Sequence, residues 1–230
     1  MITWRELLFE TADRVGDGTE ARWLCQEASG MEGAEWALGL ELPATEQAVA
    51  RLDAMVERRG AGEPLQYVLG HWAFRGLDLL VDRRVLIPRP ETEQLVEVAL
   101  AIVPGLARSP GSPLVIVDLG TGSGVIGLSL AAELVPMDLA VWACDSSDEA
   151  LQVAGANLAG IGRAAVNVRL ACGTWYEALP ATLAGGVHLV VSNPPYIADG
   201  DLSVEAVVRE WEPEAALFAG EDGLQALREV

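Results

Sequence analysis

Residues 114–124 read LVIVDLGTGSG, and this stretch predicts the fold class of the chain. Four apolar residues, three of them β-branched, are followed by Asp118, and this run predicts a buried strand over 114–118. The glycines that follow permit a tight turn. They also let a ligand approach the backbone N–H groups at the start of the helix predicted over 124–134. A strand, a glycine turn and a helix in this order predict the first unit of a parallel sheet.

The same alternation continues on both sides of this stretch. Pro90 suits the first position of a helix, and a further helix is predicted over 147–159. Strands are predicted over 139–145, 166–171 and 187–192. Helices that alternate with strands are typical of an α/β domain, here a Rossmann-like parallel sheet with helices on both faces.

The N-terminal third has a different pattern. Apolar stripes at helical spacing end at Gly16 and Gly30, and a clearer helix is predicted from an N-cap at Thr45 to Gly60. Alternating apolar residues over 72–87 are hairpin-like. We therefore expect three parts: a small all-α helical-bundle domain over 1–71, a β-hairpin linker over 72–89, and the sheet domain over 90–230.

Composition limits the classes of partner. The chain of 230 residues is 51% hydrophobic and carries a formal net charge of −19. A surface this negative repels phosphate backbones, so we expect no direct nucleic-acid binding. Three scattered cysteines predict neither a disulfide framework nor a zinc site, and no metal is expected. The first residues have no signal-peptide character and no apolar run reaches membrane-span length, so we expect a cytoplasmic protein without membrane contact.

The glycine turn predicts a nucleotide-type cofactor site. Gly122, Gly124 and Gly127 match the dinucleotide pattern G-x-G-x-x-G, which on its own is a weak signal. Asp145 ends the next predicted strand, where a carboxylate can accept both ribose hydroxyl protons of an adenosine-containing ligand. Asp118 before the turn and the G-x-G-x-G spacing favour S-adenosylmethionine. The residues expected to contact it are Asp118, Gly120, Thr121, Gly122, Ser123, Gly124 and Asp145.

A second motif, Asn193-Pro194-Pro195-Tyr196, follows the last predicted strand. The two prolines donate no backbone N–H and make the turn stiff. Asn193 Oδ1 and the Pro194 carbonyl can accept the two N–H bonds of an NH₂ group on an sp² carbon, while the Tyr196 ring covers one face. The alternative is a Pro-Pro turn in which Asn193 only caps the strand.

Together these motifs resemble class I methyltransferases that alkylate amide or exocyclic amino nitrogens, and one family in particular. Residues 63–70 (EPLQYVLG), 85–93 (VLIPRPETE), the Asn193–Tyr196 motif, Glu212-Pro213 and 220–224 (GEDGL) are similar to the release-factor glutamine methyltransferases of the HemK/PrmC type. The resemblance spans about 63–224.

This resemblance implies S-adenosylmethionine-dependent N5-methylation of the glutamine in the Gly-Gly-Gln motif of peptide-chain release factors, with S-adenosylhomocysteine as product. It adds Trp175 and Asn193 to the cofactor contacts and assigns catalysis to Asn193, Pro194 and Tyr196. The substrate would be bound by Asn193, Pro194, Pro195 and Tyr196. It also implies that the helical N-terminal domain docks the release factor.

The chain departs from the family pattern in two places. Gly173-Thr174-Trp175 has no Asp before the Trp, so no role is carried over to Thr174. The family continues through three more strands, so we expect a chain truncated at its C-terminus, with 187–192 as an unpaired sheet edge. The alternative functions are an adenine-N6 DNA methyltransferase, which needs a basic base-flipping surface, and a truncated cofactor-binding module without activity.

Overall fold

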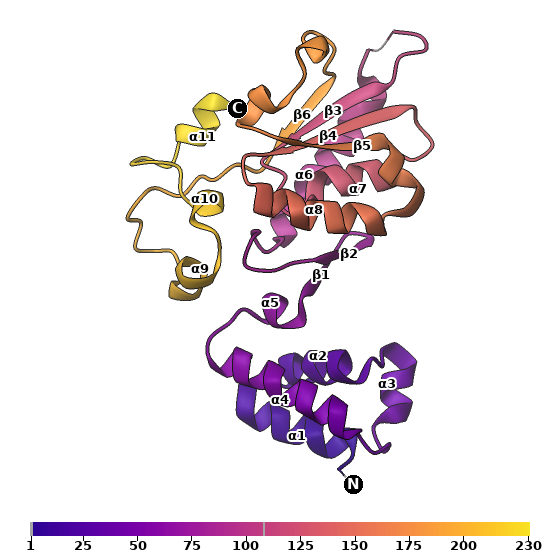
Figure 1. The fold of residues 1–230 in the computed structure, drawn as a ribbon, viewed down its shortest axis with the longest axis vertical. Coiled ribbons are helices and arrows are strands. Elements are labelled where there is room, and N and C mark those ends of the chain that lie inside the picture. The colour runs from indigo at the N-terminus through magenta and orange to yellow at the C-terminus, as the bar shows by residue number, and fades with distance from the viewer. Residues whose placement is uncertain (1, 108) are drawn as a thin grey trace. The chain divides into compact units, whose positions relative to one another are not determined.

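A computed structural model describes residues 2–107 and 109–230 (Figure 1). The chain divides into two compact units, Met1–Gly70 and His71–Val230, and each has its own hydrophobic core. Across the described residues, no helix combines the length and the apolar character that crossing a bilayer requires.

The first unit is all-helical. Its helices are α1 (Trp4–Val15), α2 (Gly18–Ser29), α3 (Gly33–Gly39), α4 (Glu46–Gly60) and α5 (Leu65–Leu69). The predicted ends of three helices are confirmed. The Thr45 hydroxyl accepts from the backbone N–H of Ala48 at the start of α4, and Gly16 and Gly30 end α1 and α2 in the left-handed conformation. Two helices, α3 and α5, were not predicted because they are too short to show a periodic pattern.

The second unit begins with an antiparallel hairpin of β1 (His71–Phe74) and β2 (Leu77–Leu80). The hairpin predicted over 72–87 is therefore wrong in its second half. The Asp82 carboxylate accepts from the backbone N–H of Arg84 and turns the chain there. Beyond this turn, the Ile87 N–H donates to the Glu212 carboxylate instead of to a strand. The hairpin belongs to the same compact unit as the sheet.

The main sheet has four parallel strands in the order β5-β4-β3-β6. Its elements are α6 (Pro90–Ile102), β3 (Leu114–Leu119), α7 (Val125–Glu133), β4 (Leu139–Asp145), α8 (Asp148–Gly160), β5 (Val168–Cys172) and β6 (Leu189–Ser192). Short 3₁₀ turns are η1 (Val103–Gly105), η2 (Gly162–Asn167), η3 (Trp175–Ala178) and η4 (Ala181–Leu183), and the last helices are α9 (Ala206–Trp211), α10 (Glu214–Leu217) and α11 (Gln225–Glu229). The predicted parallel α/β alternation is confirmed.

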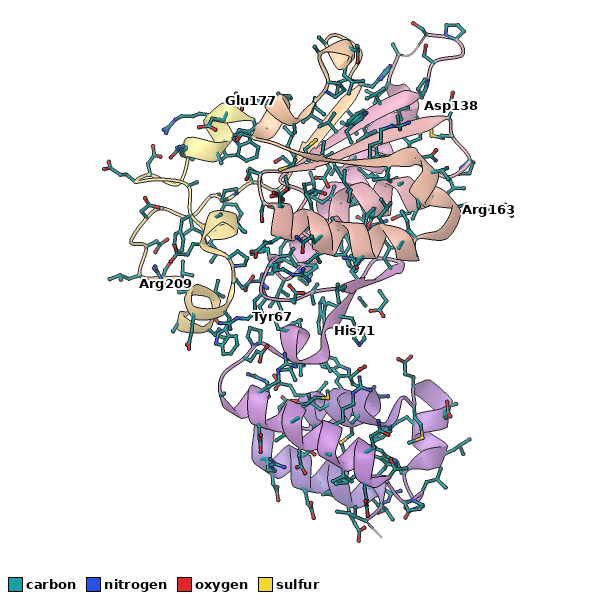
Figure 2. All side chains as sticks on the ribbon, in the orientation of Figure 1. Tyr67, His71, Asp138, Arg163, Glu177 and Arg209 are labelled. Carbon is teal, nitrogen blue, oxygen red and sulfur yellow. The ribbon has the colours of Figure 1, made fainter. Side chains whose placement is uncertain are left out.

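Helices α6, α7 and α8 pack on one face of this sheet, and side chains fill the space between them (Figures 1 and 2). The other face is covered by η3 and the segment that follows it, through Trp175, Ala178 and Leu179. The expectation of helices on both faces is therefore wrong for the described residues. The chain steps from β3 to β4 to β5 in one direction, so right-handed crossovers place α7 and α8 on the same side. The return from β5 to β6 runs over the opposite face as short turns.

Strand β6 forms one edge of the sheet, and among the described strands it pairs only with β3. Val191 is buried against the core, while Leu189 and Val190 are partly buried. Because all four strands are parallel, the residues that follow β3, β4 and β6 meet at the same end of the sheet.

Candidate functional site

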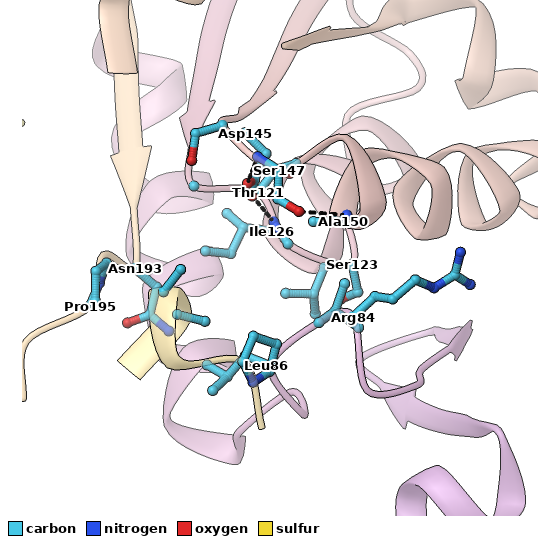
Figure 3. Close-up of a pocket in the computed structure, with 18 of the residues that line it drawn as sticks. Arg84, Leu86, Thr121, Ser123, Ile126, Asp145, Ser147, Ala150, Asn193 and Pro195 are labelled. Carbon is cyan, nitrogen blue, oxygen red and sulfur yellow. Dashed lines mark hydrogen bonds between the residues drawn. The ribbon is translucent and has the colours of Figure 1, made fainter. Parts of the chain in front are cut away.

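A cavity of about 240 Å³ lies at the carboxyl ends of β3, β4 and β6. It is where a parallel α/β sheet binds ligands, next to the point at which the strand order reverses direction. Of the residues expected to form a site, Gly120, Thr121, Gly122, Ser123, Asp145, Trp175, Asn193 and Pro195 line it. Asp145 and Asn193 reach it from different strand ends (Figure 3).

The glycine turn after β3 is held in place by β4. The backbone N–H groups of Gly120 and Thr121 both donate to the Cys144 carbonyl at 2.9 Å. Gly120 and Gly122 have positive φ angles of 72° and 55°, which glycine adopts at little cost. The Gly122 N–H donates to Asp145 Oδ2 at 2.8 Å, and the Ser147 N–H donates to Oδ1 at 2.9 Å. Each carboxylate oxygen keeps lone pairs for a further donor in the cavity.

Asp118 does not line the cavity, contrary to its expected role as a cofactor contact. Its side chain is fully buried behind the turn, where Oδ2 accepts from the Thr121 hydroxyl and from the Gly127 N–H at 2.9 Å. Among the described residues, Oδ1 has no hydrogen-bond partner. Burial raises the pKa of the Asp118 carboxyl to about 6. The structure therefore places Asp118 as a support of the turn.

Gly124 also lies outside the cavity lining. It forms the N-cap of α7 in the left-handed conformation. A Cβ atom there would come within 2.7 Å of Leu128 Cδ1, so glycine is needed for both backbone angle and space. Trp175 has a positive φ of 46° and lines the cavity next to the turn, since a Cβ atom on Gly120 would lie 3.7 Å from Trp175 Cζ3. Its indole Nε1 donates to Glu229 at 2.6 Å.

Asn193 lines both this cavity and a second one of about 420 Å³. The second cavity is lined by Pro194 and Tyr196 of the same turn and by Asn193 itself. Tyr196 is 65% exposed, so its ring is accessible from solvent. The turn thus contributes Pro195 to the first cavity, Pro194 and Tyr196 to the second, and Asn193 to both. This arrangement suits a group that is held between two molecules.

Two acceptors on this turn remain open. Asn193 Nδ2 donates to Thr92 Oγ1 at 3.4 Å. In the described part of the chain, neither Asn193 Oδ1 nor the Pro194 carbonyl accepts a hydrogen bond. A planar amide oxygen and a rigid backbone carbonyl are therefore available to receive the two N–H bonds of an NH₂ group.

Sequence reasoning missed two further walls of the site. Leu86, Arg89 and Thr92, around the start of α6, line both cavities, as does Ala216 from α10. Their signal was present in the segments 85–93 and Ala216-Leu217, which are similar to the same family but were given no chemical role.

The first cavity fits an adenosine-containing ligand. Ser123 is 2% exposed and its hydroxyl has no partner within the described chain, so a ligand atom or a water would satisfy it. A Cβ atom on Gly122 would meet nothing within 4 Å, so the backbone is open toward the cavity. The Asp145 carboxylate can accept ribose hydroxyl protons.

Fold and site together define a methyltransferase domain of the class I type. Residues 106–216 match the family "Methyltransferase small domain", and residues 1–70 match the family "PrmC N-terminal domain". The sheet, the glycine turn and the Asn193–Tyr196 motif all lie in the second unit.

Curated relatives narrow the class. A release factor glutamine methyltransferase from Burkholderia pseudomallei is 42% identical over 217 residues, which cover 93% of this chain and 73% of that protein. A second, from Koribacter versatilis, is 42% identical over a match that covers 83% of this chain and 63% of the relative. A third, from Gloeobacter violaceus, is 39% identical over a match that covers 99% of this chain and 76% of the relative. The chain belongs to the release factor glutamine methyltransferase family.

Proposed function

We propose that this chain transfers a methyl group from S-adenosylmethionine to the side-chain amide nitrogen of a glutamine in a peptide-chain release factor. The observation that carries the proposal is the position of Asn193, which lines both cavities and keeps its amide oxygen open. Membership of the family supports the choice of a release-factor glutamine, since the curated relatives are named release factor glutamine methyltransferases. The resemblance of the sequence motifs implies that this glutamine lies in the Gly-Gly-Gln motif.

The first cavity would hold the cofactor. Asp145 would accept the ribose hydroxyl protons, the turn from Gly120 to Ser123 would contact it through backbone and hydroxyl groups, and Trp175 would cover it. When bound, the cofactor supplies an electrophilic methyl group on a sulfonium. Asn193 lines the same cavity, so the amide that it holds from the second cavity would face this methyl group.

The nucleophile is weak because the lone pair of an amide nitrogen is delocalised into its carbonyl group. Asn193 Oδ1 and the Pro194 carbonyl would accept the two N–H bonds and increase the electron density on nitrogen. They would also fix its direction, which lowers the entropic part of the barrier. The amide nitrogen would gain the bond to the methyl carbon, and the bond between that carbon and sulfur would break to leave S-adenosylhomocysteine. Transfer of the methyl group makes the nitrogen acidic, so the proton leaves afterwards. No general base is therefore required before the methyl group is transferred.

The substrate glutamine lies on a protein, so docking contacts beyond the cavities are required. We propose that the helical unit Met1–Gly70 provides them, and that the activity is cytoplasmic, where translation takes place. The net charge of −19 favours a partner with positive charge around its glutamine loop.

Mass spectrometry tests the proposal. A release factor is incubated with the chain and S-adenosylmethionine, and the peptide that contains Gly-Gly-Gln is examined for a gain of one methyl group on glutamine. A release factor with Gln→Ala in that motif is the matched control, and duplex DNA tests the adenine-N6 alternative. Cofactor binding without methylation of either substrate would leave only a cofactor-binding module.

A further inference from the structure

One buried carboxylate links two walls of the site. The Glu212 side chain is only 2% exposed, although it comes from the segment between α9 and α10. Its Oε2 accepts from the Ile87 N–H at 3.1 Å, and its Oε1 pairs with Nη2 of Arg89. Arg89 lines both cavities, and so does Ala216, four residues after Glu212. The carboxylate therefore joins the segment before α6 to the segment that forms the facing wall.

The link continues from Arg89 to the motif residue. The Arg89 carbonyl accepts from the Thr92 N–H at 3.0 Å in the first turn of α6. Thr92 is 8% exposed, and its hydroxyl accepts from Asn193 Nδ2 at 3.4 Å. A chain of polar contacts thus runs from Glu212 through Arg89 and Thr92 to Asn193.

The direction of the last contact matters for the chemistry. A side-chain amide has an accepting and a donating end, and only the accepting end can hold the N–H of another amide. With Nδ2 against Thr92, Oδ1 is left for the substrate. Thr92 can do this only if the start of α6 is fixed, and Pro90 at the first helical position donates no hydrogen bond of its own. The two bonds to Glu212 anchor it from the side of the cavities, while Arg75 holds Glu93 of the same helix through its backbone N–H and its guanidinium.

We propose that Thr92 and Glu212 are positioning residues for methyl transfer. Thr92 holds the Asn193 amide by accepting from Nδ2, which leaves Oδ1 toward the cavities, and Glu212 fixes Thr92 through Ile87 and Arg89. The inference rests on the proposed function, because it concerns the group that would hold the substrate glutamine.

Four variants test the assignment. Thr92→Val removes the hydroxyl at nearly constant volume, and Thr92→Ser restores it. Glu212→Gln keeps an acceptor for the Ile87 N–H but removes the charge that holds Arg89. Glu133→Gln is the matched control, because it breaks a two-bond ion pair with Arg75 in the same unit, and neither residue lines a cavity. It also leaves in place the bonds from Arg75 to Glu93 on α6. All are measured well below their melting temperatures.

In single-turnover methylation of a release factor, Thr92→Val and Glu212→Gln should each slow transfer about tenfold, while cofactor affinity stays within about threefold. The transfer rate of Thr92→Ser should lie within about threefold of the wild-type rate, and the rate of Glu133→Gln should equal that of the wild type. The double variant should lose less than the product of the single losses, because both act on one amide. Single-variant rates within twofold of wild type, or losses that multiply in the double variant, would overturn the proposal.

A second measurement does not depend on activity. The side-chain NH₂ resonances of Asn193, identified by their disappearance in Asn193→Asp, should shift in Thr92→Val and Glu212→Gln but not in Glu133→Gln. Unchanged resonances would refute the inference even if the wild type methylates release factors. Shifted resonances in a protein without methylation activity would support the inference and reject the proposed function.

Discussion

Asp145 Oδ2 accepts a 2.8 Å hydrogen bond from the Gly122 N–H, so the residue at the tip of β4 holds the turn that follows β3. One carboxylate thus serves two purposes. It shapes the glycine turn, and it presents acceptor lone pairs to the cavity that the turn encloses.

Asp145→Ala should weaken S-adenosylmethionine binding by about ten- to hundredfold, since a pair of charge-assisted hydrogen bonds contributes about 1.5–3 kcal/mol. Titration calorimetry measures this directly. Asp148→Ala is the control, because Asp148 is exposed on the first turn of α8 and lines neither cavity. An affinity for the cofactor within twofold of wild type in Asp145→Ala would contradict the assignment.

Asn193→Ala should act on the chemical step. Because the cofactor has other contacts in the first cavity, its affinity should stay within about tenfold, while single-turnover methylation should fall on the order of 10²-fold or more. Rapid-quench measurements at saturating cofactor separate the two effects. If transfer is as fast in the variant as in the wild type, the Asn193–Tyr196 turn is only structural.

The parts of the site that could be predicted from sequence are those fixed by topology. Asp145 and Asn193 each follow a predicted parallel strand, and parallel strands bring their carboxyl ends together, so their convergence on one cavity was foreseeable. Sequence alone could not show which way Asp118 points, since it is also at a strand end but turns beneath the glycine loop.

The errors in the predicted fold also arise where contacts between distant residues decide the local structure. The apolar run Val85–Ile87 resembles a strand, yet the partner of the Ile87 N–H is Glu212, a residue 125 positions away. A contact of that separation leaves no periodic signal. The prediction of helices on both sheet faces failed because the connection from β5 to β6, which covers the second face, forms only the short turns η3 and η4.

The buried carboxyl of Asp118 predicts a pH-dependent stability. Its pKa is raised to about 6 in the folded chain, against about 3.9 in an unfolded chain, so the folded state binds more protons between these values. The stabilisation from this group is fully present below pH 3.9 and is lost as the pH rises through 6. The loss amounts to about 3 kcal/mol.

Asp118→Asn isolates this effect, because an amide oxygen can still accept from Thr121 and Gly127 but does not titrate. The free energies of unfolding of both proteins are measured in urea from pH 4 to pH 7. Relative to the variant, the wild type should lose up to about 3 kcal/mol across this range. Two stability curves that run parallel would show that Asp118 keeps an ordinary pKa.

The last prediction concerns the helical unit Met1–Gly70, which has a core separate from that of His71–Val230. If it docks the release factor, a chain that begins at His71 should bind S-adenosylmethionine within about twofold of the full chain, since every residue lining the first cavity is retained. Its KM for the release factor should rise about tenfold or more, while kcat changes little, because only binding that is equal in ground and transition states is removed.

A second arm keeps the whole chain and replaces the exposed Glu10, Glu32, Glu35 and Glu46 by Lys, which should raise KM and reduce its dependence on salt. An unaltered KM in both arms would leave the helical unit as a scaffold with no part in docking.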